Sequence, residues 1–294
     1  MCDLTQLISL KRKEAIKKAW YKFTLNKLSA VGLVIVVAII FLAIFAPFIV
    51  PYPADAGYSF NFALGSKPPS WAHLFGTDDY GRDVLSRVVF GFRYSLLMAV
   101  VVLSIVVPVG CALGLLAGYF KGTLIEQLIM RITDIFVAVP ALILAMAVCA
   151  VLTPSLINAM LAITVMWWAW YCRLTYGVAS SFRNEFFVQA AQVTGASTFH
   201  IVFREILPNC LGTILTRATL DVGIVILLGA SLSFVGLGAQ PPTPDLGTMI
   251  AQGYVFMPQW WWMTLFPAFA ILLTIVGFNL VGDGVRDMFA TEAL

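Results

Sequence analysis

Six long stretches of the chain are almost entirely apolar, and polar segments separate them. Each stretch has about the 20 residues that an α-helix needs to cross the hydrocarbon core of a bilayer. Proline, glycine or charged residues bound or interrupt each stretch, and Pro140 lies inside the third. The approximate limits of the stretches are 28–50, 95–118, 127–152, 155–177, 211–237 and 261–281. The pattern predicts an all-α integral membrane protein with six transmembrane helices.

The composition indicates that lipid surrounds most of the chain. Of its 294 residues, 61% are hydrophobic and 11% are charged, whereas a soluble domain carries roughly 25% charged residues. The five cysteines form no CxxC pair, and most lie in or beside apolar runs, where cysteine packs as a small hydrophobic residue. We therefore expect no disulfide framework and no metal site. We expect His73 and His200 to be solvated loop residues.

The distribution of Lys and Arg predicts how the helices are oriented. Seven of these residues lie in 11–27, ahead of the first span, whereas the loop 238–260 contains none. Both termini and the loop 178–210 are therefore expected in the cytoplasm. The loops 51–94 and 238–260 are expected outside.

The N-terminal segment, 1–27, is expected to lie in the cytoplasm ahead of the six-helix domain, 28–294. Its basic, amphipathic pattern is typical of an interfacial helix whose lysines meet anionic lipid. The aromatic residues that would lie at headgroup level are Trp20, Tyr21 and Phe23. A binding site for a soluble partner is the alternative.

The loop 178–210 contains the most informative polar segment of the chain. An apolar stripe recurs at helical spacing in its first part; its residues are Phe187, Ala190, Ala191 and Thr194. Gly195 can adopt the left-handed conformation that ends a helix, and Ser197 can cap a second helix. Pro208 is expected to stop that second helix before the fifth span. The pattern predicts a cytoplasmic helix–turn–helix.

This helix–turn–helix has two interpretations. The second half carries apolar side chains that could fill a groove on another protein; these are Phe199, Ile201 and Phe203. Alternatively, the segment is an ordinary amphipathic connector that lies on the membrane.

Few polar residues lie within the predicted spans. Asp221, with Arg217 one helical turn before it, falls in the first half of the fifth span. A charge near the membrane centre costs about 2.5–3.5 kcal/mol on insertion scales, so it normally faces a cavity or a partner. Asp221 therefore either lines a translocation path or forms a stabilising pair with Arg217. Asn279, in the last span, is a further candidate for the path or for an interhelical hydrogen bond.

Two segments outside the spans also carry distinctive residues. The segment 76–87 mixes acids and bases and is expected to form an amphipathic helix that leads into the second span. It either contacts an external partner or supports the local structure. The run 260–262, three tryptophans, is typical of an aromatic belt at the outer membrane interface. Stacking on a substrate is the alternative for this run.

The polar segment resembles a known motif. Gln189-Ala190-Ala191, then Gly195, then Leu207-Pro208 match the spacing of the EAA motif of bacterial ABC importer permeases. Two positions depart from that motif, because Gln189 stands where glutamate is common and Glu205 stands where isoleucine is common.

Other segments narrow the resemblance. The segment 76–87 is similar to the GTDxxGRDxxSR sequence of the dipeptide/oligopeptide/nickel permease family. The further segments that resemble this family are 130–134, 232–242 and 279–287. They follow the family's order from about residue 22 to residue 287, and the chain looks like the second, C-type permease subunit of such an importer.

The resemblance implies a non-catalytic subunit that forms half of a translocation pathway. It implies a homologous second permease subunit, two cytoplasmic ATP-binding subunits that hold ATP and Mg, an extracytoplasmic substrate-binding protein and no nucleic acid. It places the chain in the bacterial cytoplasmic membrane. The chain has no GxxxxGK[ST] phosphate loop, so we expect no cofactor in it. Closure of the ATPases would then rock the permease pair between inward-open and outward-open states.

The resemblance also implies which residues dock on an ATPase. These are Gln189, Ala190, Ala191, Gly195, Ser197, Phe199, Phe203, Leu207 and Pro208. The implied cargo is a dipeptide, an oligopeptide, a glutathione-like peptide, nickel or a metal chelate. A single-chain secondary transporter or channel is the alternative, and it would usually show an inverted internal repeat. A membrane-embedded enzyme would need a catalytic cluster, and the sequence has no HExxH or comparable motif.

Overall fold

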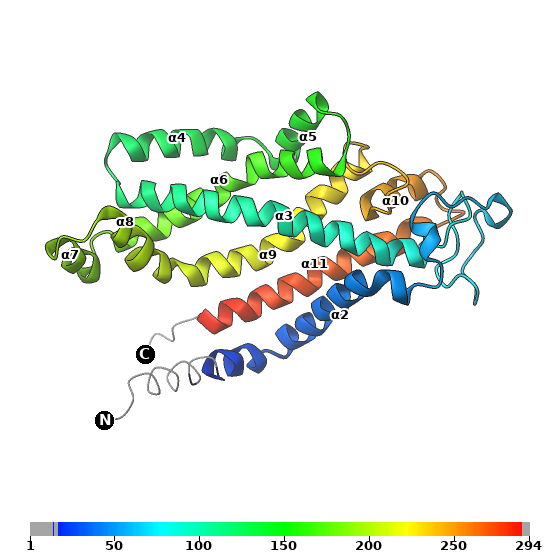
Figure 1. The fold of residues 1–294 in the computed structure, drawn as a ribbon, viewed down its shortest axis with the longest axis horizontal. Helices are drawn as coiled ribbons and strands as arrows, with labels where there is room; N and C mark the ends of the chain where they lie inside the picture. The colour runs from blue at the N-terminus through cyan, green and yellow to red at the C-terminus, as the bar shows by residue number, and fades with distance from the viewer. Residues whose placement is uncertain (1–13, 15–16, 290–294) are drawn as a thin grey trace.

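The computed structural model describes residue 14 and residues 17–289, which fold into helices joined by loops (Figure 1). The long helices are α2 (Lys27–Ile49), α3 (Val84–Tyr119), α6 (Leu156–Phe182), α9 (Leu207–Phe234) and α11 (Trp262–Phe289). The shorter elements are η1 (Pro53–Ala56), η2 (Phe62–Leu64), α4 (Leu124–Ala138), α5 (Ala141–Val151), α7 (Phe186–Val193), α8 (Thr198–His200), the π-helical η3 (Ile201–Ile206) and α10 (Leu246–Tyr254). The prediction of an all-α fold is confirmed for these residues.

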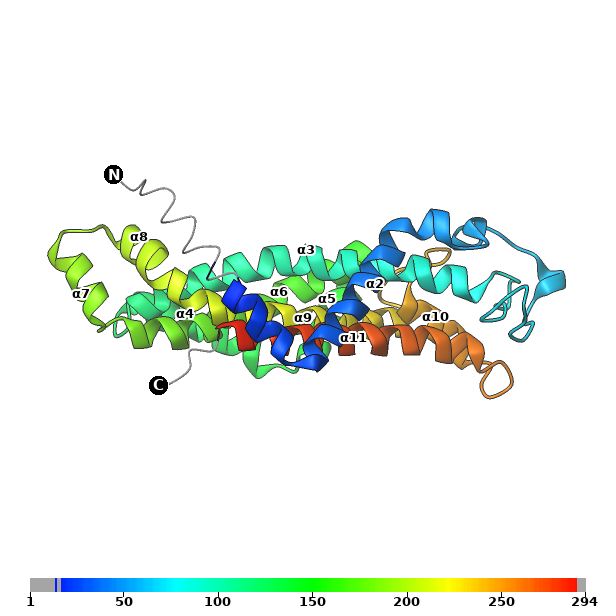
Figure 2. The same ribbon diagram turned by 90° about the horizontal axis from the view of Figure 1, so that it is seen from below.

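The long helices run side by side along one axis. Helices α3, α6 and α9 form the middle of the bundle, α4 lies beyond α6, and α11 and α2 lie on the opposite side (Figure 1). Helices α7 and α8 form one end, and the loops between α2 and α3 form the other (Figures 1 and 2). The beginning of α2 and the end of α11 point toward the end that holds α7 and α8.

Among the described residues, four helical stretches are long and apolar enough to cross a membrane. They are α2, α3, the continuous stretch Thr198–Phe234 and α11. The pair α4 and α5 makes a fifth if it is counted as one span. Helix α6 has 27 residues but does not belong to this group. The apolar character of several spans is thus confirmed, whereas the number six stays a prediction.

The third predicted span is a broken pair of helices rather than one helix containing Pro140. Helix α4 ends at Ala138, α5 begins at Ala141, and their axes differ by 90°. Val139 has an extended backbone with ψ 132. The ring of a proline clashes with a helical conformation at the residue before it, so Pro140 favours the break at Val139.

The second span begins earlier than the apolar pattern predicts. Helix α3 starts at Val84, so the predicted outer loop 51–94 loses its last 11 residues to the helix. Asp83 caps this start, since its side chain accepts a hydrogen bond from the Ser86 N–H. The charged residues that made 84–94 read as a loop are Arg87 and Arg93; Arg87 is buried and Arg93 is exposed.

Small residues bring α3 and α6 into close contact. Gly110, Gly114 and Gly118 recur at intervals of four on one face of α3. A Cβ on Gly114 would lie 2.0 Å from Oγ1 of Thr175, and one on Gly118 would lie 2.7 Å from Cβ of Ala179. A stripe of small residues lets two membrane helices approach until their backbones touch. This contact fixes α6 along α3 at the centre of the bundle.

Part of the predicted interfacial helix lies within the described residues. Residues 17–25 are helical, and Trp20 and Tyr21 are exposed, as expected for side chains at a membrane surface. Phe23 is buried, with 4% exposure, because its ring packs against Gly284 of α11. Its predicted place at headgroup level is therefore wrong. The basic positions 11–13 lie outside the described residues.

Asp245 gives the end of the bundle that holds α10 a pH-dependent stability. Its buried side chain caps α10 by accepting from the Thr248 N–H at 3.1 Å. Burial is the largest cause that raises the pKa of this carboxyl above its usual value. The folded chain thus holds the proton more tightly than the unfolded chain. The stabilisation is present at low pH and is lost as pH rises through the raised pKa.

Asp245→Asn should remove this dependence, since an amide keeps the capping oxygen and carries no charge. We expect the thermal midpoint of the variant to exceed that of the native chain at pH 7. This difference should shrink as the pH falls toward about 4, the usual pKa of aspartate. Melting curves in detergent across this range measure it. A difference that stays constant with pH would contradict the prediction.

Candidate functional site

The turn of the predicted helix–turn–helix has the expected geometry. Gly195 has φ 78, in the left-handed region that favours glycine. Its N–H donates to the Gln192 carbonyl at 3.0 Å, and the Ala196 N–H donates to the Ala191 carbonyl at 3.0 Å. These two bonds are the Schellman pattern that closes a helix C-terminus. Ser197 then caps α8, because its Oγ accepts from the His200 N–H at 3.3 Å.

This turn projects from the end of the bundle, as Figure 2 shows for α7 and α8. Val188 of α7 and Ile201, Val202 and Ile206 of η3 are fully or almost fully buried, and they join the main hydrophobic core. The implied docking residues that are exposed are Gln189, Ala190, Gly195, Ser197, Phe199 and Pro208; those that are partly buried are Ala191, Phe203 and Leu207. The segment thus has one face anchored in the bundle and another left open.

The open face carries aromatic and apolar side chains. Phe186 is 86% exposed, Val193 is 88% exposed and Phe199 is 69% exposed. The Phe199 ring lies 4.7 Å from the Phe203 ring, centroid to centroid. Ile201 is 1% exposed, so the expectation that it reaches a partner is wrong. Ile201 is two residues from Phe199 in the sequence, but its side chain points into the core and that of Phe199 points outward.

Pro208 does not stop the second helix, contrary to the sequence prediction. Residues Thr198–Phe234 are helical without interruption. The six residues of η3 before Leu207 form wider π-helical turns, in which the Leu207 N–H donates to the Val202 carbonyl. A proline removes one N–H and clashes with the preceding turn of a regular α-helix. The wider turn relieves this conflict, and α9 continues through Pro208 into the bundle.

A buried carboxylate lies in the middle of α9. The Asp221 side chain has no exposed surface. Its Oδ1 lies 3.0 Å from Nε of Arg217, and its Oδ2 accepts a hydrogen bond from the Trp167 indole N–H at 3.0 Å. The Arg217 side chain keeps 38% exposure. The stabilising pair expected between these residues is therefore present, and a tryptophan on α6 completes it.

The candidate path residues do not all come together. Arg217 lines a cavity between α6, α9 and α11, whereas Asp221 is enclosed behind it. Asn279 is exposed on α11 and forms no hydrogen bond with either residue in the described part of the chain. The structure groups Arg217 with Asp221 and leaves Asn279 apart. A role of the three in translocation stays a prediction.

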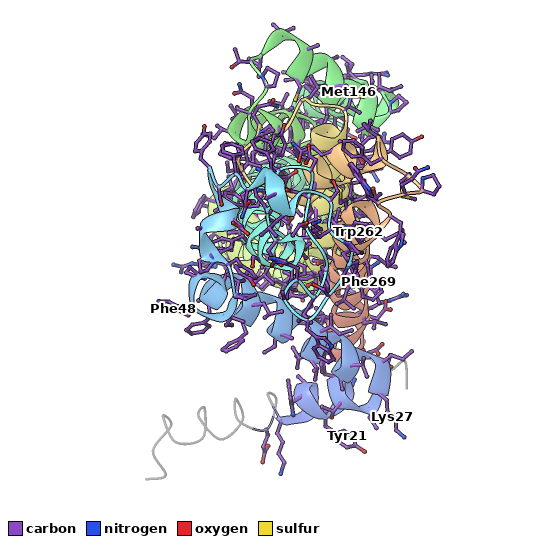
Figure 3. The ribbon with its side chains drawn as sticks, turned by 90° about the vertical axis from the view of Figure 1, so that its right-hand side faces the viewer. Tyr21, Lys27, Phe48, Met146, Trp262 and Phe269 are labelled. Atoms are coloured by element: carbon purple, nitrogen blue, oxygen red, sulfur yellow. The ribbon has the colours of Figure 1, made fainter. Side chains whose placement is uncertain are left out.

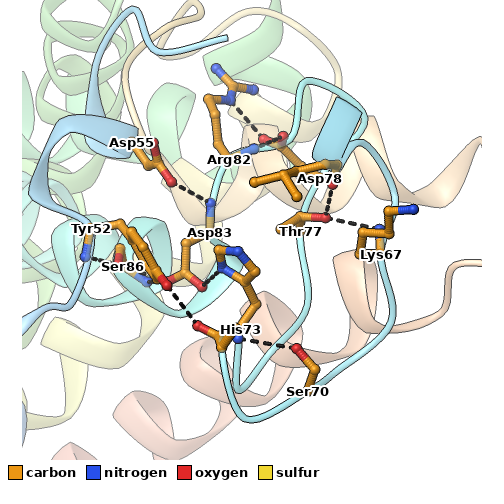
Figure 4. A network of polar contacts seen from close by, with 12 residues as sticks. Tyr52, Asp55, Lys67, Ser70, His73, Thr77, Asp78, Arg82, Asp83 and Ser86 are labelled. Atoms are coloured by element: carbon orange, nitrogen blue, oxygen red, sulfur yellow. Dashed lines mark hydrogen bonds and ion pairs between the residues drawn. The ribbon is translucent and has the colours of Figure 1, made fainter. Parts of the chain in front are cut away.

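A network of buried charges closes the opposite end of the bundle (Figure 4). Asp83, with no exposure, accepts from Nδ1 of His73 at 2.9 Å and from the Ser86 Oγ at 2.7 Å. Asp78 accepts from Nε of Arg82 at 2.7 Å. Arg82 is 2% exposed. His73 is 8% exposed and bonded to Asp83, so its predicted solvation is wrong. The Asp83 carboxylate takes the place of water as its hydrogen-bond partner.

The segment 76–83 is a loop rather than the start of an amphipathic helix. Oδ1 of Asp78 accepts from the Tyr80 and Arg82 N–H groups at 3.0 Å and 2.9 Å. Such side-chain bonds to nearby backbone compete with helix formation. Gly81 has φ 79 in the same turn. Burial, followed by the neighbouring Asp78 charge, raises the pKa of Asp79 above its usual value. The segment gives local structural support, one of the two roles expected.

Trp262 belongs to the core and not to an interfacial belt. It is 5% exposed, and its indole N–H donates to the Thr77 carbonyl at 3.0 Å. Figure 3 shows Trp262 within the bundle, whereas Phe48 projects from α2. Trp261 keeps 42% exposure and fits the predicted belt. The polar end of the Trp262 ring therefore anchors the loop between α2 and α3 to α11.

Asp83→Ala should loosen the contacts that Asp83 makes with His73 and Ser86. The change removes the α3 cap, worth about 1 kcal/mol, and leaves the buried donors of His73 and Ser86 unsatisfied, at a cost of about 1–3 kcal/mol each. We expect a lower thermal midpoint and faster cleavage of the loop 51–83 by protease. Asp83→Asn keeps the capping oxygen, so its thermal midpoint and cleavage rate should lie between those of the native chain and Asp83→Ala. Equal cleavage of all three chains would contradict the prediction.

Part of this cap has a signal in the sequence. An aspartate directly before an apolar run is a helix-start pattern. It could have placed the beginning of α3 at Asp83. Nothing in the local sequence links His73 or Trp262 to it, because those contacts depend on tertiary structure.

Within the described residues, no group of three His, Cys, Asp or Glu side chains could hold a metal ion.

Two family descriptions match the chain. "Binding-protein-dependent transport system inner membrane component" matches residues 110–292, and "N-terminal TM domain of oligopeptide transport permease C" matches residues 15–69. The first match covers more than half of the chain and includes the turn at Gly195 and all of α9.

Similar curated proteins extend over almost the whole chain. A dipeptide transport system permease protein of Escherichia coli is 45% identical over 279 residues, 92% of this chain and 91% of that protein. A di/tripeptide transport system permease protein of Pseudomonas aeruginosa is 40% identical, covering 95% and 93%. An oligopeptide transport system permease protein of Bacillus subtilis is 38% identical, covering 95% and 90%. The chain therefore belongs to the inner membrane components of binding-protein-dependent ABC transport systems, in the dipeptide and oligopeptide permease family.

Proposed function

We propose that the chain is the C-type permease subunit of an ATP-driven peptide importer and forms half of its translocation pathway. The observation that carries this proposal is the exposed turn at Gly195, which the family match includes. Its buried side is fixed to the bundle core, so a force on α7 and α8 is transmitted to α9. A segment of this kind suits a permease that moves when a partner moves.

The proposal includes the partners that the chain lacks. A homologous permease subunit completes the pathway, and two cytoplasmic subunits bind ATP and Mg. An extracytoplasmic protein delivers the substrate. The chain crosses the bacterial cytoplasmic membrane six times, through α2, α3, the α4–α5 pair, α6, α9 and α11. At about 1.5 Å per residue, the 27 residues of α6 are long enough to span it. Both termini then lie in the cytoplasm.

Peptides are the proposed cargo. The similar proteins carry names for dipeptide, di/tripeptide and oligopeptide transport, and these names do not support the nickel or metal-chelate alternative.

Reconstitution tests the proposal. Proteoliposomes that contain this chain with its second permease and ATPases should take up a labelled dipeptide when binding protein and ATP are both present. Omitting this chain, the ATPases or ATP should remove uptake. Uptake by this chain alone would contradict the proposal and favour a single-chain transporter. Uptake of nickel in place of the dipeptide would overturn the assigned cargo only.

A further inference from the structure

A cavity of about 770 Å³ lies between α6, α9 and α11, on the half of the bundle nearer to α7 and α8 (Figure 1). Its polar lining consists of Asn209, Thr213, Thr216 and Arg217 of α9 and Arg286 of α11. Leucine and phenylalanine side chains of α6, α9 and α11, together with Pro208 and Gly212, make up the rest of the wall. The cavity thus combines hydrogen-bond donors and cations with an apolar border.

Among the described residues that line the cavity, one arginine has no ion pair. Arg217 is neutralised by Asp221, which lies 3.0 Å away. Arg286 is exposed and has no ion pair or side-chain hydrogen bond in the described part of the chain. Asp283 and Asp287 are close to it in sequence, but neither lines the cavity or pairs with it. A planar guanidinium with five donors is therefore free to bind an anion.

The position of the cavity favours an anion that comes from lipid. Pro208 and Arg217 both line it and are nine residues apart on α9, so the cavity extends about 14 Å along the helix. Helices α9 and α11 both have the length and apolarity of membrane spans. Arg286 is exposed in the last turn of α11, so it lies at the depth of a membrane interface, where anionic headgroups are found. Basic pockets between membrane helices are known to bind anionic headgroups.

We propose that this cavity binds the phosphate of an anionic phospholipid. Arg286 binds the phosphate, with support from the hydroxyl and amide side chains of α9. The apolar border receives the first part of an acyl chain. A free phosphate would match the arginine but would not use the apolar border. A peptide carboxylate is the competing ligand, and the titration below distinguishes it from the lipid.

Lipid titration of the delipidated complex tests the proposal. Thermal midpoints are measured in detergent with phosphatidylglycerol, with phosphatidylcholine and with inorganic phosphate. Phosphatidylglycerol should raise the midpoint, while phosphatidylcholine and inorganic phosphate at the same concentration should not. An equal effect of inorganic phosphate would show a site for free phosphate and overturn the lipid source. An equal effect of phosphatidylcholine, or protection by a dipeptide alone, would also overturn the proposal.

Two variants locate the site. Arg286→Gln should weaken the effect of phosphatidylglycerol by about five- to tenfold, the loss expected for one cation at an anionic headgroup. Arg131→Gln is the matched control, because Arg131 is exposed on α4 and outside the cavity; it should leave the effect unchanged. If Arg286→Gln does not assemble, Thr213→Val tests the same wall. An unchanged lipid response in the assembled variants would contradict the proposal.

Discussion

Replacing Gly195 by valine is expected to lower ATP-driven uptake at least about tenfold while the chain still inserts and assembles. With φ 78, Gly195 adopts a conformation that costs an L-residue about 1–2 kcal/mol and a β-branched residue more. A Cβ at this position meets no atom within 4 Å, so the effect is one of backbone conformation and not of a clash. The strained turn would give up the Schellman bonds and separate α7 from α8.

The measurements are dipeptide uptake and substrate-stimulated ATP hydrolysis by the reconstituted complex. A docking segment that has lost its shape should reduce both together. Gly195→Asn should keep most of the activity, since asparagine tolerates the left-handed region better than other residues. Gly177→Ala serves as the matched control, because Gly177 lies in the regular part of α6 with open space around it. A Gly195→Val complex that still couples ATP hydrolysis to uptake would show that the docking role is wrong.

This turn could be predicted from sequence because its determinants are local. A glycine after an apolar stripe and a serine two residues later specify a helix end and a new helix start over a few positions. The bonds that close the turn join residues no more than five apart. The same locality explains why the pairing of Arg217 with Asp221 could be expected, since residues four apart lie on one face of a helix.

The end of the bundle that holds the loops between α2 and α3 was harder to predict, because long-range contacts determine it. His73, Asp83 and Trp262 read as exposed polar or interfacial residues in sequence. In the structure, His73 pairs with Asp83, and Trp262 bonds to Thr77, 185 positions away. Each polar group is buried only because another segment supplies its partner. Hydropathy therefore placed the spans well along the chain but misjudged where α3 begins.

Pro140 and Pro208 also show the difference between local sequence signals and tertiary contacts. Pro140 breaks the third predicted span, whereas Pro208 lies within a continuous helix. Sequence rules treat both as helix breakers. The difference is made by the π-helical turns before Pro208, which the residues of η3 hold against the core through Ile201, Val202 and Ile206. Tertiary packing thus decides whether a helix continues through a proline or ends at it.

Removing Arg217 is the second change with a large expected effect. Arg217→Met would leave the Asp221 carboxylate buried with only the Trp167 indole as a partner. Breaking a buried ion pair in this way costs about 3–5 kcal/mol. Arg217 keeps 38% exposure, so solvent screening moves the expectation to the lower end of that range. The complex should melt at a lower temperature and yield less assembled protein.

Asp221→Asn should be milder, because the amide oxygen can still accept from the Trp167 N–H and the Arg217 side chain keeps 38% exposure in the cavity that it lines. Combining Arg217→Met with Asp221→Asn should recover much of the stability that Arg217→Met loses, since no buried charge is then left unpaired. Thermal midpoints of the four chains form a double-mutant cycle. Additive losses would contradict a direct pairing.

The same variants distinguish the two roles considered for Asp221. If the carboxylate acts only as a structural partner of Arg217, assembled Asp221→Asn complexes should take up dipeptide at the native rate. If its charge lines or gates the path, their uptake should fall while their thermal midpoint changes little. The enclosure of Asp221 by Arg217 and Trp167 favours the structural role. Normal uptake by the assembled Asp221→Asn complex would exclude the path role, because only the charge has then been removed.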